Sequence, residues 1–300
     1  MTMRTQSDRL IDEQVQRFHR DGFLNAGMVL SEAEVLELGD ALAAVIAKGP
    51  DGFAGVKPHP VLFHDMAATR DGEGNVVSEN PNYQIVNIWQ CAEPFRRLLF
   101  HPLVIRAISQ LTGFTDLQIW HDQVQYKPAK TGGSTPWHQD APLWPSIEPM
   151  TPVSAWIPLD NADVDNGCMW MVPGSHLWGN QMEFLGSAAA HLKTRDAFAN
   201  LPAFTPPADA PIQSVTAQPC PVKRGEVHFH HSLTWHGSPF NQSDRPRQAV
   251  AIHYMTSEAI FTGRDHVMRQ FIDLQVGQRM LDAGAYFPVV CRENEPVTVA

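Results

Sequence analysis

Five short runs of residues that favour β-strands occupy the middle of this 300-residue chain, and they limit its fold more than any other feature. Proline and glycine separate the runs, and apolar and polar side chains alternate within them. Strands at this density are typical of a sandwich or a barrel, so the fold is predicted to be mainly β. The runs are LQIWHDQVQYK from Leu117, VSAWIPLD from Val153, CMWMVPG from Cys168, GEVHFHHSLTW from Gly225 and RQAVAIHYM from Arg247.

The segment before these strands is predicted to be rich in helices. Apolar side chains recur at helical spacing between Leu10 and Phe18, which indicates one helix. Ser31 is a typical N-cap residue, and Glu32 follows it where the helix dipole favours an acidic group. Residues 8–48 are therefore predicted to form two helices around a short extended piece.

Turn-forming residues and one proline divide the next part of the chain. Gly, Pro, Asp and Asn are frequent in residues 49–80, which predicts loops and short strands. Apolar residues between Glu93 and about Leu111 have the spacing of a third helix. We expect Pro102 to break or kink that helix, because proline lacks the N–H group and clashes with the preceding turn.

The whole chain, residues 1–300, is predicted to be a single domain, since one elaborated core can reach this size. A Pro- and Ala-rich insertion at about 179–222 interrupts the strands and contains a short helical pattern around Ala188 to Phe198. Such a long insertion is often an active-site lid, but a surface elaboration without a chemical role is an equal alternative. The predicted parts are residues 1–113, a helix-rich N-terminal elaboration; 114–256, the strand-rich core with its insertion; and 257–300, a C-terminal helix and tail.

The charge balance narrows the classes of partner. The chain has 22 Lys and Arg residues against 32 Asp and Glu residues, which gives a formal net charge of -10 at pH 7. An acidic protein without a basic block is poorly suited to bind a nucleic-acid backbone or an anionic membrane. We therefore expect a small-molecule substrate as the partner, with no nucleic acid and no membrane.

Neither the cysteines nor the N-terminus indicates secretion. The cysteines are scattered without C-x-x-C spacing, so we interpret them as reduced structural thiols. Charged residues occur throughout the first thirty positions, where a signal peptide or a membrane span would need an uninterrupted apolar stretch. The expected location is the cytoplasm. The cysteines are Cys91, Cys168, Cys220 and Cys291.

The segment STPWHQDAPLWP contains a pair of residues that could bind a metal ion. His138 and Asp140 are two positions apart, and in an extended strand this spacing turns both side chains to one face. The pair alone is weak evidence, because a histidine beside an aspartate is more often a surface pair or a satisfied core histidine. A metal site therefore needs a third ligand from elsewhere in the chain.

A later segment supplies a candidate for that ligand. His236 ends a β-prone run, residues 237–246 favour a turn, and Arg247 opens the next run, so a hairpin would bring Arg247 back beside His236. Two imidazoles and one carboxylate on one face of a metal form the facial triad of non-haem iron oxygenases, which leaves positions open for a cosubstrate and dioxygen. Arg247 would then bind the far carboxylate of 2-oxoglutarate through its planar pair of donors.

Periodicity alone does not select His236 as the third ligand. His228 and His230 share its face of the expected strand, and His231 is a further candidate. A zinc hydrolase is a separate alternative, because it could use a His-rich strand with a carboxylate, although it has no use for an arginine at this spacing. The choice of His236 depends on its H-G-S context and on its distance from Arg247.

With these motifs in view, the sequence resembles the phytanoyl-CoA dioxygenase family, within the larger class of iron- and 2-oxoglutarate-dependent oxygenases. The resemblance runs from FHRDGFL at Phe18 through WHQDAPLW, WIPLDNADVDNGCMWMVPGSH and HGSPFNQSDRPRQ, and it fades after about Tyr254. It implies a double-stranded β-helix, or jelly-roll, core with flanking α-helices. It also implies Fe(II) as the metal, with 2-oxoglutarate and O2 as cosubstrates.

The resemblance assigns roles to individual residues. It implies an arginine eleven positions after the last metal-binding histidine, which selects Arg247 over Arg245. It further implies that Trp156 and Ser238 contact the cosubstrate. The alternatives are that Trp156 is simply part of the core and that the hydroxyl of Ser238 simply caps a turn. The implied iron ligands are His138, Asp140 and His236.

The strand from Leu117 to Lys127 offers further side chains to the pocket. Gln123, Gln125 and Lys127 share one face if the strand is regular, and the corresponding strand of the family faces the cosubstrate. We expect Gln123 to contribute to the cosubstrate site. We expect Lys127 to lie on a solvated face.

Two tryptophans flank the H-x-D pair with large apolar surfaces. Trp137 and Trp144 suggest a pocket for a hydrophobic or aromatic substrate. The alternative is that they only form the wall of the barrel mouth.

The motifs predict an Fe(II)- and 2-oxoglutarate-dependent dioxygenase that hydroxylates a small organic substrate, such as a natural-product intermediate or an amino-acid derivative, with formation of succinate and CO2. Asp140 argues against a halogenase, in which chloride takes the place of this carboxylate. Desaturation or cyclisation would use the same ligands, so the sequence does not separate these outcomes. An acyl-CoA hydroxylase of the same family and a non-catalytic jelly-roll ligand-binding module are the alternatives.

Overall fold

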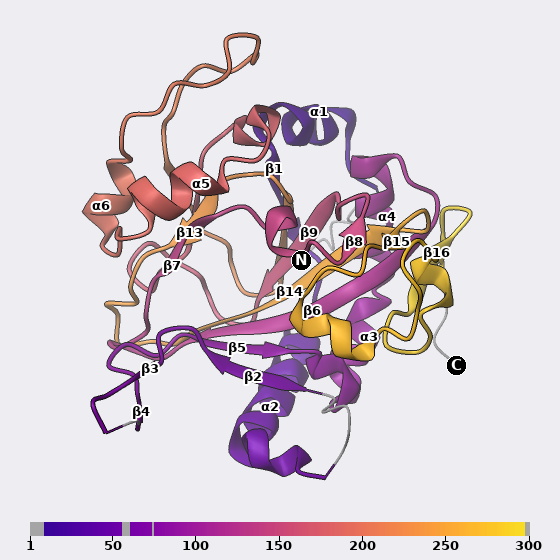
Figure 1. Cartoon of the computed structure of the whole chain (residues 1–300), viewed down its shortest axis with the longest axis horizontal. Helices are drawn as coiled ribbons and strands as arrows, with labels where there is room; N and C mark the ends of the chain where they lie inside the picture. Colours follow the sequence, from indigo (N-terminus) through magenta and orange to yellow (C-terminus); the bar gives the residue numbers. More distant parts are fainter. Residues whose placement is uncertain (1–8, 56–60, 74, 298–300) are drawn as a thin grey trace, which may run out of the picture.

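Figure 1 shows the computed structural model of the chain, which describes residues 9–55, 61–73 and 75–297. Within these residues, no helix has both the length and the apolar character needed to cross a membrane. All four cysteines are free thiols, and Cys91 is the one that is only half-buried.

The N-terminal part contains two helices joined by a strand. Helix α1 (Asp12–Asp21), strand β1 (Phe23–Met28) and helix α2 (Glu32–Lys48) follow one another directly. The side chain of Ser31 accepts a hydrogen bond from the backbone N–H of Glu34 and so caps α2, as predicted. The predicted pair of helices around an extended piece is confirmed over its described residues.

Loops, short strands and two further helices lead to the long strands of the core. Their bounds are η1 (Pro50–Phe53), β2 (Leu62–Asp65), β3 (Thr69–Arg70), β4 (Val76–Val77), β5 (Tyr83–Val86), η2 (Ile88–Gln90), α3 (Glu93–Leu99) and α4 (Pro102–Thr112). The predicted third helix is thus divided where proline was expected to divide it. Pro102 begins α4, a position at which a missing N–H group costs nothing.

An antiparallel sheet of nine strands, the main sheet, forms one wall of the core (Figure 1). Its remaining strands are β6 (Leu117–Lys127), β9 (Val153–Pro158), β12 (Glu226–His231), β14 (Arg247–Thr256), β16 (Val289–Arg292) and β17 (Glu295–Pro296). The order is β1, β12, β9, β14, β6, β16 and β17, while β5 pairs with β6 and β2 pairs with β5.

A second sheet of four strands forms the opposite wall. Its order is β11 (Gln218–Cys220), β10 (Met169–Met171), β13 (His236–Ser238) and β7 (Thr135–His138). The inner side chains Trp156 and Ala251 of the main sheet share an apolar cluster with Trp137 and Met171 of the second sheet. Two antiparallel sheets packed in this way form a jelly-roll core, which confirms the predicted fold class.

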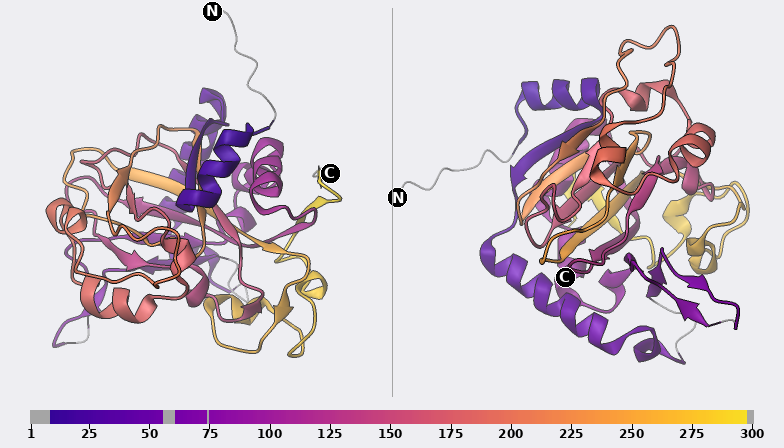
Figure 2. Two further views of the ribbon diagram at one scale, coloured as in Figure 1. Left: turned by 90° about the horizontal axis from the view of Figure 1, so that it is seen from above. Right: turned by 90° about the vertical axis from the view of Figure 1, so that its left-hand side faces the viewer.

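The other face of the main sheet is covered by helices. Leu42 of α2, Phe95 of α3 and Ile105 of α4 belong to one apolar cluster with Val124 and Ile252 of the sheet. In the right-hand view of Figure 2, α2 runs along the outside of the strands. Because side chains alternate along a strand, the residues between these outer ones point into the jelly roll.

The insertion after residue 179 packs onto the second sheet through aromatic rings. Phe198 stacks on Trp137 with ring centroids 5.0 Å apart, and Phe184 and Phe204 lie 5.4 and 4.7 Å from the ring of Trp235. Several short helical pieces occur where one short helical pattern was predicted. Around and within the insertion these are the 3-10 helix η4 (Ser175–Trp178), α5 (Met182–Phe184), the π-helix η5 (Leu185–Ala189) and α6 (Arg195–Ala199).

The C-terminal helix predicted within residues 257–300 is wrong, because the described residues of this part form no α-helix. Gly263, Gly277 and Gly284 have φ angles of 80°, 88° and 85°, which interrupt regular structure. Strand β16 instead pairs with β6, and β15 pairs with β8. The bounds are β8 (Ile147–Glu148), β15 (Ile260–Phe261), η6 (Val267–Phe271) and η7 (Met280–Asp282).

Candidate active site

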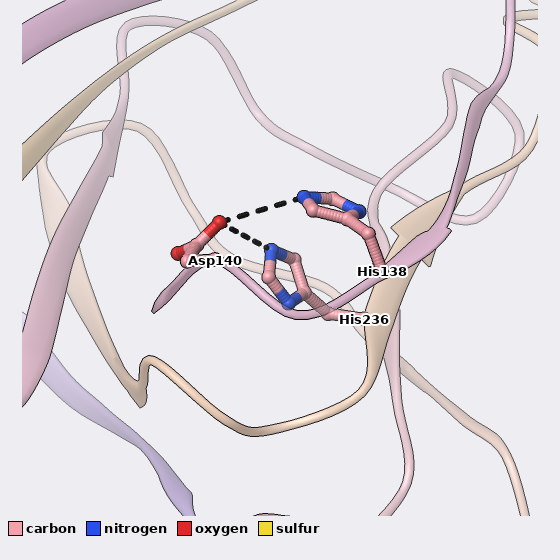
Figure 3. A group of neighbouring side chains, drawn as sticks. All are labelled: His138, Asp140 and His236. Carbon is pink, nitrogen blue, oxygen red and sulfur yellow. Dashed lines mark ion pairs between the residues drawn. The ribbon is translucent and has the colours of Figure 1, made fainter. Parts of the chain in front are cut away.

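His138, Asp140 and His236 meet at the edge of the second sheet (Figure 3). His138 ends β7 and His236 begins β13, and the two residues are partners in the antiparallel pairing of these strands. Nε2 of each histidine lies 3.5 Å from Oδ1 of Asp140. The three ligand atoms lie within 4.8 Å of one another, so the structure brings the predicted ligands together.

Asp140 reaches this point by a different backbone route from the predicted one. The sequence prediction places both members of the H-x-D pair on one face of a strand, but β7 ends at His138. Asp140 has φ -70° and ψ -54° and precedes the 3-10 helix η3 (Ala141–Leu143). A turn of the chain, rather than strand alternation, therefore directs the carboxylate at the two imidazoles.

Both histidines are held in the ring form that binds a metal. Nδ1 of His138 lies 2.8 Å from the carbonyl oxygen of Pro136, and Nδ1 of His236 lies 2.9 Å from that of Thr234. A carbonyl oxygen only accepts, so Nδ1 carries the hydrogen in both rings and Nε2 presents its lone pair. Two such nitrogens and a carboxylate directed at one point fit an iron(II) ion.

The second oxygen of Asp140 is held by two donors from the main sheet. Nε2 of His230 lies 3.1 Å from Oδ2, and the hydroxyl of Ser154 lies 3.2 Å from the same atom. Burial acts to raise the pKa of Asp140, but the neighbouring His236 and the hydrogen bond from His230 hold that pKa well below its usual value. Asp140 is therefore a carboxylate whose Oδ2 is fixed, while Oδ1 faces the two histidines.

The competing histidines have other surroundings. His230 supports Asp140 from outside the group of three ligand atoms. His228 is buried, and neither of its ring nitrogens has a hydrogen-bond partner among the described residues. His231 packs against His176 with ring centroids 5.2 Å apart. The geometry therefore supports His236 as the third ligand.

We expect His230→Phe and Ser154→Ala each to weaken iron(II) binding roughly 10- to 100-fold, because each variant removes a hydrogen bond that orients a metal ligand. Anaerobic competition with a chelator measures the affinity. His228→Phe is the matched control, since His228 lies on the same strand and face but forms no hydrogen bond to the triad. Equal losses in His228→Phe and His230→Phe would show that packing, not the hydrogen bond, matters.

Arg247 lies behind the wall of the cavity that adjoins the triad, and it is 1% exposed. Its Nη2 donates to Oγ of Ser238 at 3.2 Å, and its Nη1 donates to Oε1 of Gln125 at 3.5 Å. The guanidinium carbon lies 5.6 Å from the centre of the Trp156 ring. Ser238, Gln125 and Trp156 all line the cavity, so Arg247 contacts the residues that form its wall.

Lys127 is completely buried, so the prediction of a solvated position is wrong. It is the partner of Arg247 in the pairing of β6 with β14. Its Nζ donates to the carbonyl oxygens of Ser238 and Pro239 at 3.1 and 2.8 Å. The H-G-S turn thus covers this end of β6, a contact between distant segments that strand alternation cannot reveal.

The inner end of the site contains two buried basic side chains, Lys127 and Arg247. Burial lowers the pKa of Arg247 to about 10 and holds the pKa of Lys127 well below its usual value. Among the residues that the structure describes, neither side chain has an ion-pair partner. Buried basic groups without a carboxylate are unfavourable unless a ligand supplies one, so this end of the site fits an anionic group.

Lys127→Met is expected to lower the free energy of unfolding by about 1–3 kcal/mol, because methionine keeps most of the length but leaves two buried carbonyl oxygens without their donor. Urea denaturation measures the change. Lys130→Met, at an exposed position three residues later, serves as the control and should change stability by less than about 0.5 kcal/mol. Unaltered stability in Lys127→Met would contradict the structural role of the buried amine.

A small, partly open cavity lies beside the triad. Gln123 lines it as expected, and its Oε1 accepts a hydrogen bond from Gln84. Trp137 and Trp144 are buried but are not lining residues, which agrees with the alternative that they form walls. The lining residues are Gln123, Gln125, Thr135, His138, Asp140, Trp156, Met169, His230, His236, Gly237, Ser238, Ala251 and His253.

Sequence reasoning missed two polar residues of the main sheet. Ser154 pairs with His230 on one side and with His253 on the other, and all three are buried. Every second residue of a strand points to the same face, so the inward position of Ser154 follows from that of Trp156 on β9. The same alternation on β14 places His253 on the face of Ala251.

Gln139, the middle residue of the H-x-D motif, was also missed. Its side chain is completely buried, and its Nε2 donates to the carbonyl oxygens of Gly179 and Leu233 at 2.9 and 2.7 Å. Its Oε1 accepts from the backbone N–H of Gln181 at 2.6 Å. Gln139 therefore ties the start of the insertion to the metal-binding motif, and no local pattern in the sequence indicates this contact.

Comparison with known proteins agrees with this geometry. The family model of phytanoyl-CoA dioxygenase matches residues 18–249. Phytanoyl-CoA dioxygenase domain-containing protein 1 of Bos taurus is 25% identical over 283 residues, which cover 86% of this chain and 94% of that protein. The crystal structure of the non-haem alpha-ketoglutarate-dependent carbocyclase SnoK from nogalamycin biosynthesis has a TM-score of 0.67 and 25% identity, covering 93% of this chain and 96% of that one. The epimerase SnoN, in complex with Fe3+, alpha-ketoglutarate and nogalamycin RO, has a TM-score of 0.63 and 23% identity, covering 93% and 97%.

A jelly-roll core with two histidines and an aspartate converging at its edge defines the class of non-haem iron, 2-oxoglutarate-dependent oxygenases. Within that class the chain belongs to the phytanoyl-CoA dioxygenase family, whose model matches 232 of its 300 residues, from 18 to 249. The protein is therefore an enzyme, and the alternative of a non-catalytic ligand-binding module is set aside.

Proposed function

We propose that the protein hydroxylates a small organic molecule with Fe(II), 2-oxoglutarate and O2, and that it forms succinate and CO2. The observation that carries this proposal is the convergence of two histidine Nε2 atoms on Oδ1 of one aspartate, each 3.5 Å away. Iron with 2-oxoglutarate supplies the oxidising power for attack on a C–H bond. The chain's own residues would bind the iron and the cosubstrate.

Each group of residues has a proposed task. Arg247 and Ser238 would bind the distal carboxylate of 2-oxoglutarate, because a guanidinium offers two parallel donors to a carboxylate. Trp156 and Gln123 would contact the cosubstrate along the cavity wall. Lys127 would hold the H-G-S turn in place through its hydrogen bonds to the carbonyl oxygens of Ser238 and Pro239. The proposed iron ligands are His138, Asp140 and His236.

The proposed substrate is a free small molecule, such as a natural-product intermediate or an amino-acid derivative. The net charge of -10 does not favour an acyl-CoA, whose nucleotide phosphates would need a basic surface. The similarity to SnoK, a protein of nogalamycin biosynthesis, supports a natural-product substrate. An acyl-CoA hydroxylase of the same family stays the alternative.

Oxidative ring closure is a second candidate reaction. SnoK is a carbocyclase and is 25% identical to this chain over nearly its whole length. The same ligands and cosubstrate can serve either outcome, because the fate of the oxidised substrate depends on how the walls position it. The product distinguishes the two reactions, since hydroxylation adds one oxygen atom and ring closure removes two hydrogen atoms.

We further propose that the insertion of residues 179–222 acts as a cover for the site. Gln139 ties its first residues to the H-x-D motif, and Phe198 stacks on Trp137 beside that motif. A segment anchored at the metal-binding motif can exclude water from the reaction.

Succinate formation tests the proposed function. Purified protein with Fe(II), 2-oxoglutarate and O2 should form succinate slowly without substrate and faster with an accepted compound from a panel of natural-product intermediates and amino-acid derivatives. Asp140→Ala is the control and should form none above background. Succinate formation that is equal in Asp140→Ala and wild type, or absent from wild type throughout the panel, would refute the proposal.

A further inference from the structure

Four buried polar side chains form one row across the inner face of the main sheet. His230 on β12 pairs with Ser154 on β9, Ser154 pairs with His253 on β14, and His253 pairs with His121 on β6. Residues in register on one face of a sheet are close enough to interact. The row touches the proposed metal site through His230 and Ser154, which both contact Oδ2 of Asp140.

The hydrogen bonds of this row determine which nitrogen of His253 carries the hydrogen. The hydroxyl of Ser154 lies 3.2 Å from Oδ2 of Asp140 and 2.7 Å from Nδ1 of His253. A carboxylate only accepts, so the single hydroxyl hydrogen goes to Asp140, and Ser154 accepts a hydrogen bond from His253. Nδ1 of His253 is therefore the N–H, and Nε2 presents a lone pair.

That lone pair has no partner in the part of the chain that the structure describes. His253 is 1% exposed and lines the cavity beside the triad, so solvent on the surface does not satisfy Nε2. The Trp144 ring packs against the imidazole with centroids 4.4 Å apart and fixes its orientation. A buried acceptor without a donor is costly, which points to a donor supplied by a bound molecule.

The cosubstrate does not supply this donor. The carboxylate and keto oxygens of 2-oxoglutarate are acceptors only, and an acceptor does not pair with a lone pair.

We propose that His253 is a substrate-binding residue whose Nε2 accepts a hydrogen bond from an O–H or N–H group of the substrate. This inference rests on the proposed function, and it narrows the substrate to molecules with such a donor close to the position that is oxidised. Alcohols, phenols and amides meet this condition. A thioester group offers no donor, so an acyl-CoA does not suit the site at this point.

Nuclear magnetic resonance of the full-length protein, labelled with 15N in histidine and loaded with zinc instead of iron, tests the proposal without turnover. The first measurement is the ring form of His253, assigned by comparison with His253→Phe and recorded with and without metal. Nδ1 should be protonated and Nε2 bare. The second measurement is titration with phenol and with anisole, two probes of similar shape of which only phenol has a hydroxyl donor.

Phenol is expected to bind roughly two- to tenfold more tightly than anisole, the range that one hydrogen bond contributes, and to shift the Nε2 resonance of His253. The preference should disappear in His253→Phe and persist in His228→Phe. A proton on Nε2 in the wild type, equal affinity for the two probes, or a preference retained in His253→Phe would each overturn the proposal. Because these results need neither iron nor oxygen, they are independent of the succinate assay.

Discussion

Alanine in place of His138, Asp140 or His236 is expected to abolish iron-dependent turnover while the fold is retained. Loss of an outer hydrogen bond to a ligand already costs roughly 10- to 100-fold in metal affinity, and loss of the ligand itself should cost more. The structure supports this expectation, because each Nε2 atom faces Oδ1 of Asp140 and no other described acidic group joins the three ligands. Succinate formation and iron content, measured on the same samples, check it.

His231→Ala is the control for the choice of the third ligand. His231 is next to His230 in the sequence, but it packs on His176 and is not one of the three converging residues. The variant should retain iron and turnover close to those of wild type. If His231→Ala lost iron while His236→Ala kept it, the assignment of the third ligand would be wrong.

Arg247→Ala is expected to raise the apparent dissociation constant of 2-oxoglutarate by roughly one and a half to three and a half decades. Removing one partner of a buried, hydrogen-bonded charge pair typically costs about 2–5 kcal/mol. Arg247 is almost completely buried and lacks an ion-pair partner among the described residues, so its charge is available for the distal carboxylate. Iron binding without cosubstrate should change little, because the iron ligands are untouched. Titration of 2-oxoglutarate into the iron-loaded variant measures the effect.

Two further variants test whether the position of the arginine and the planar shape of its guanidinium group both matter for binding 2-oxoglutarate. Arg245 is exposed and forms ion pairs with Asp163 and Asp165 at 2.9 and 3.6 Å, so Arg245→Ala should bind 2-oxoglutarate nearly like wild type. Arg247→Lys should recover only part of the loss, because an ammonium restores the charge but not the planar pair of donors. A large defect in Arg245→Ala beside normal binding in Arg247→Ala would show that the hairpin register is misassigned.

Features set by local sequence were predictable. Strand β6 occupies Leu117–Lys127 and β14 begins at Arg247, as the alternating β-prone runs indicated. Pro102 divides the predicted third helix because its chemistry acts on adjacent residues. The H-x-D pair and the H-G-S triplet were recognisable because metal binding restricts the residue types and their spacing.

Features set by contacts between distant segments were not predictable. Lys127 is buried because Ser238 and Pro239 fold over it, and nothing near Lys127 in the sequence indicates that cover. The carboxylate of Asp140 depends on His230, ninety residues later, for one of its donors. Register across a sheet is a property of the folded chain, so no local pattern could place these groups together.

The proposed site for iron and 2-oxoglutarate is tested most directly by an anaerobic titration of the protein with Fe(II) in the presence and absence of 2-oxoglutarate. The proposed arrangement of three protein ligands with open positions for a chelating cosubstrate predicts a weak visible charge-transfer band. The band should appear only when both components are present, saturate at one iron per chain, and disappear in Asp140→Ala. A wild-type protein that binds iron but shows no band with saturating 2-oxoglutarate would contradict the proposed binding of 2-oxoglutarate to the iron.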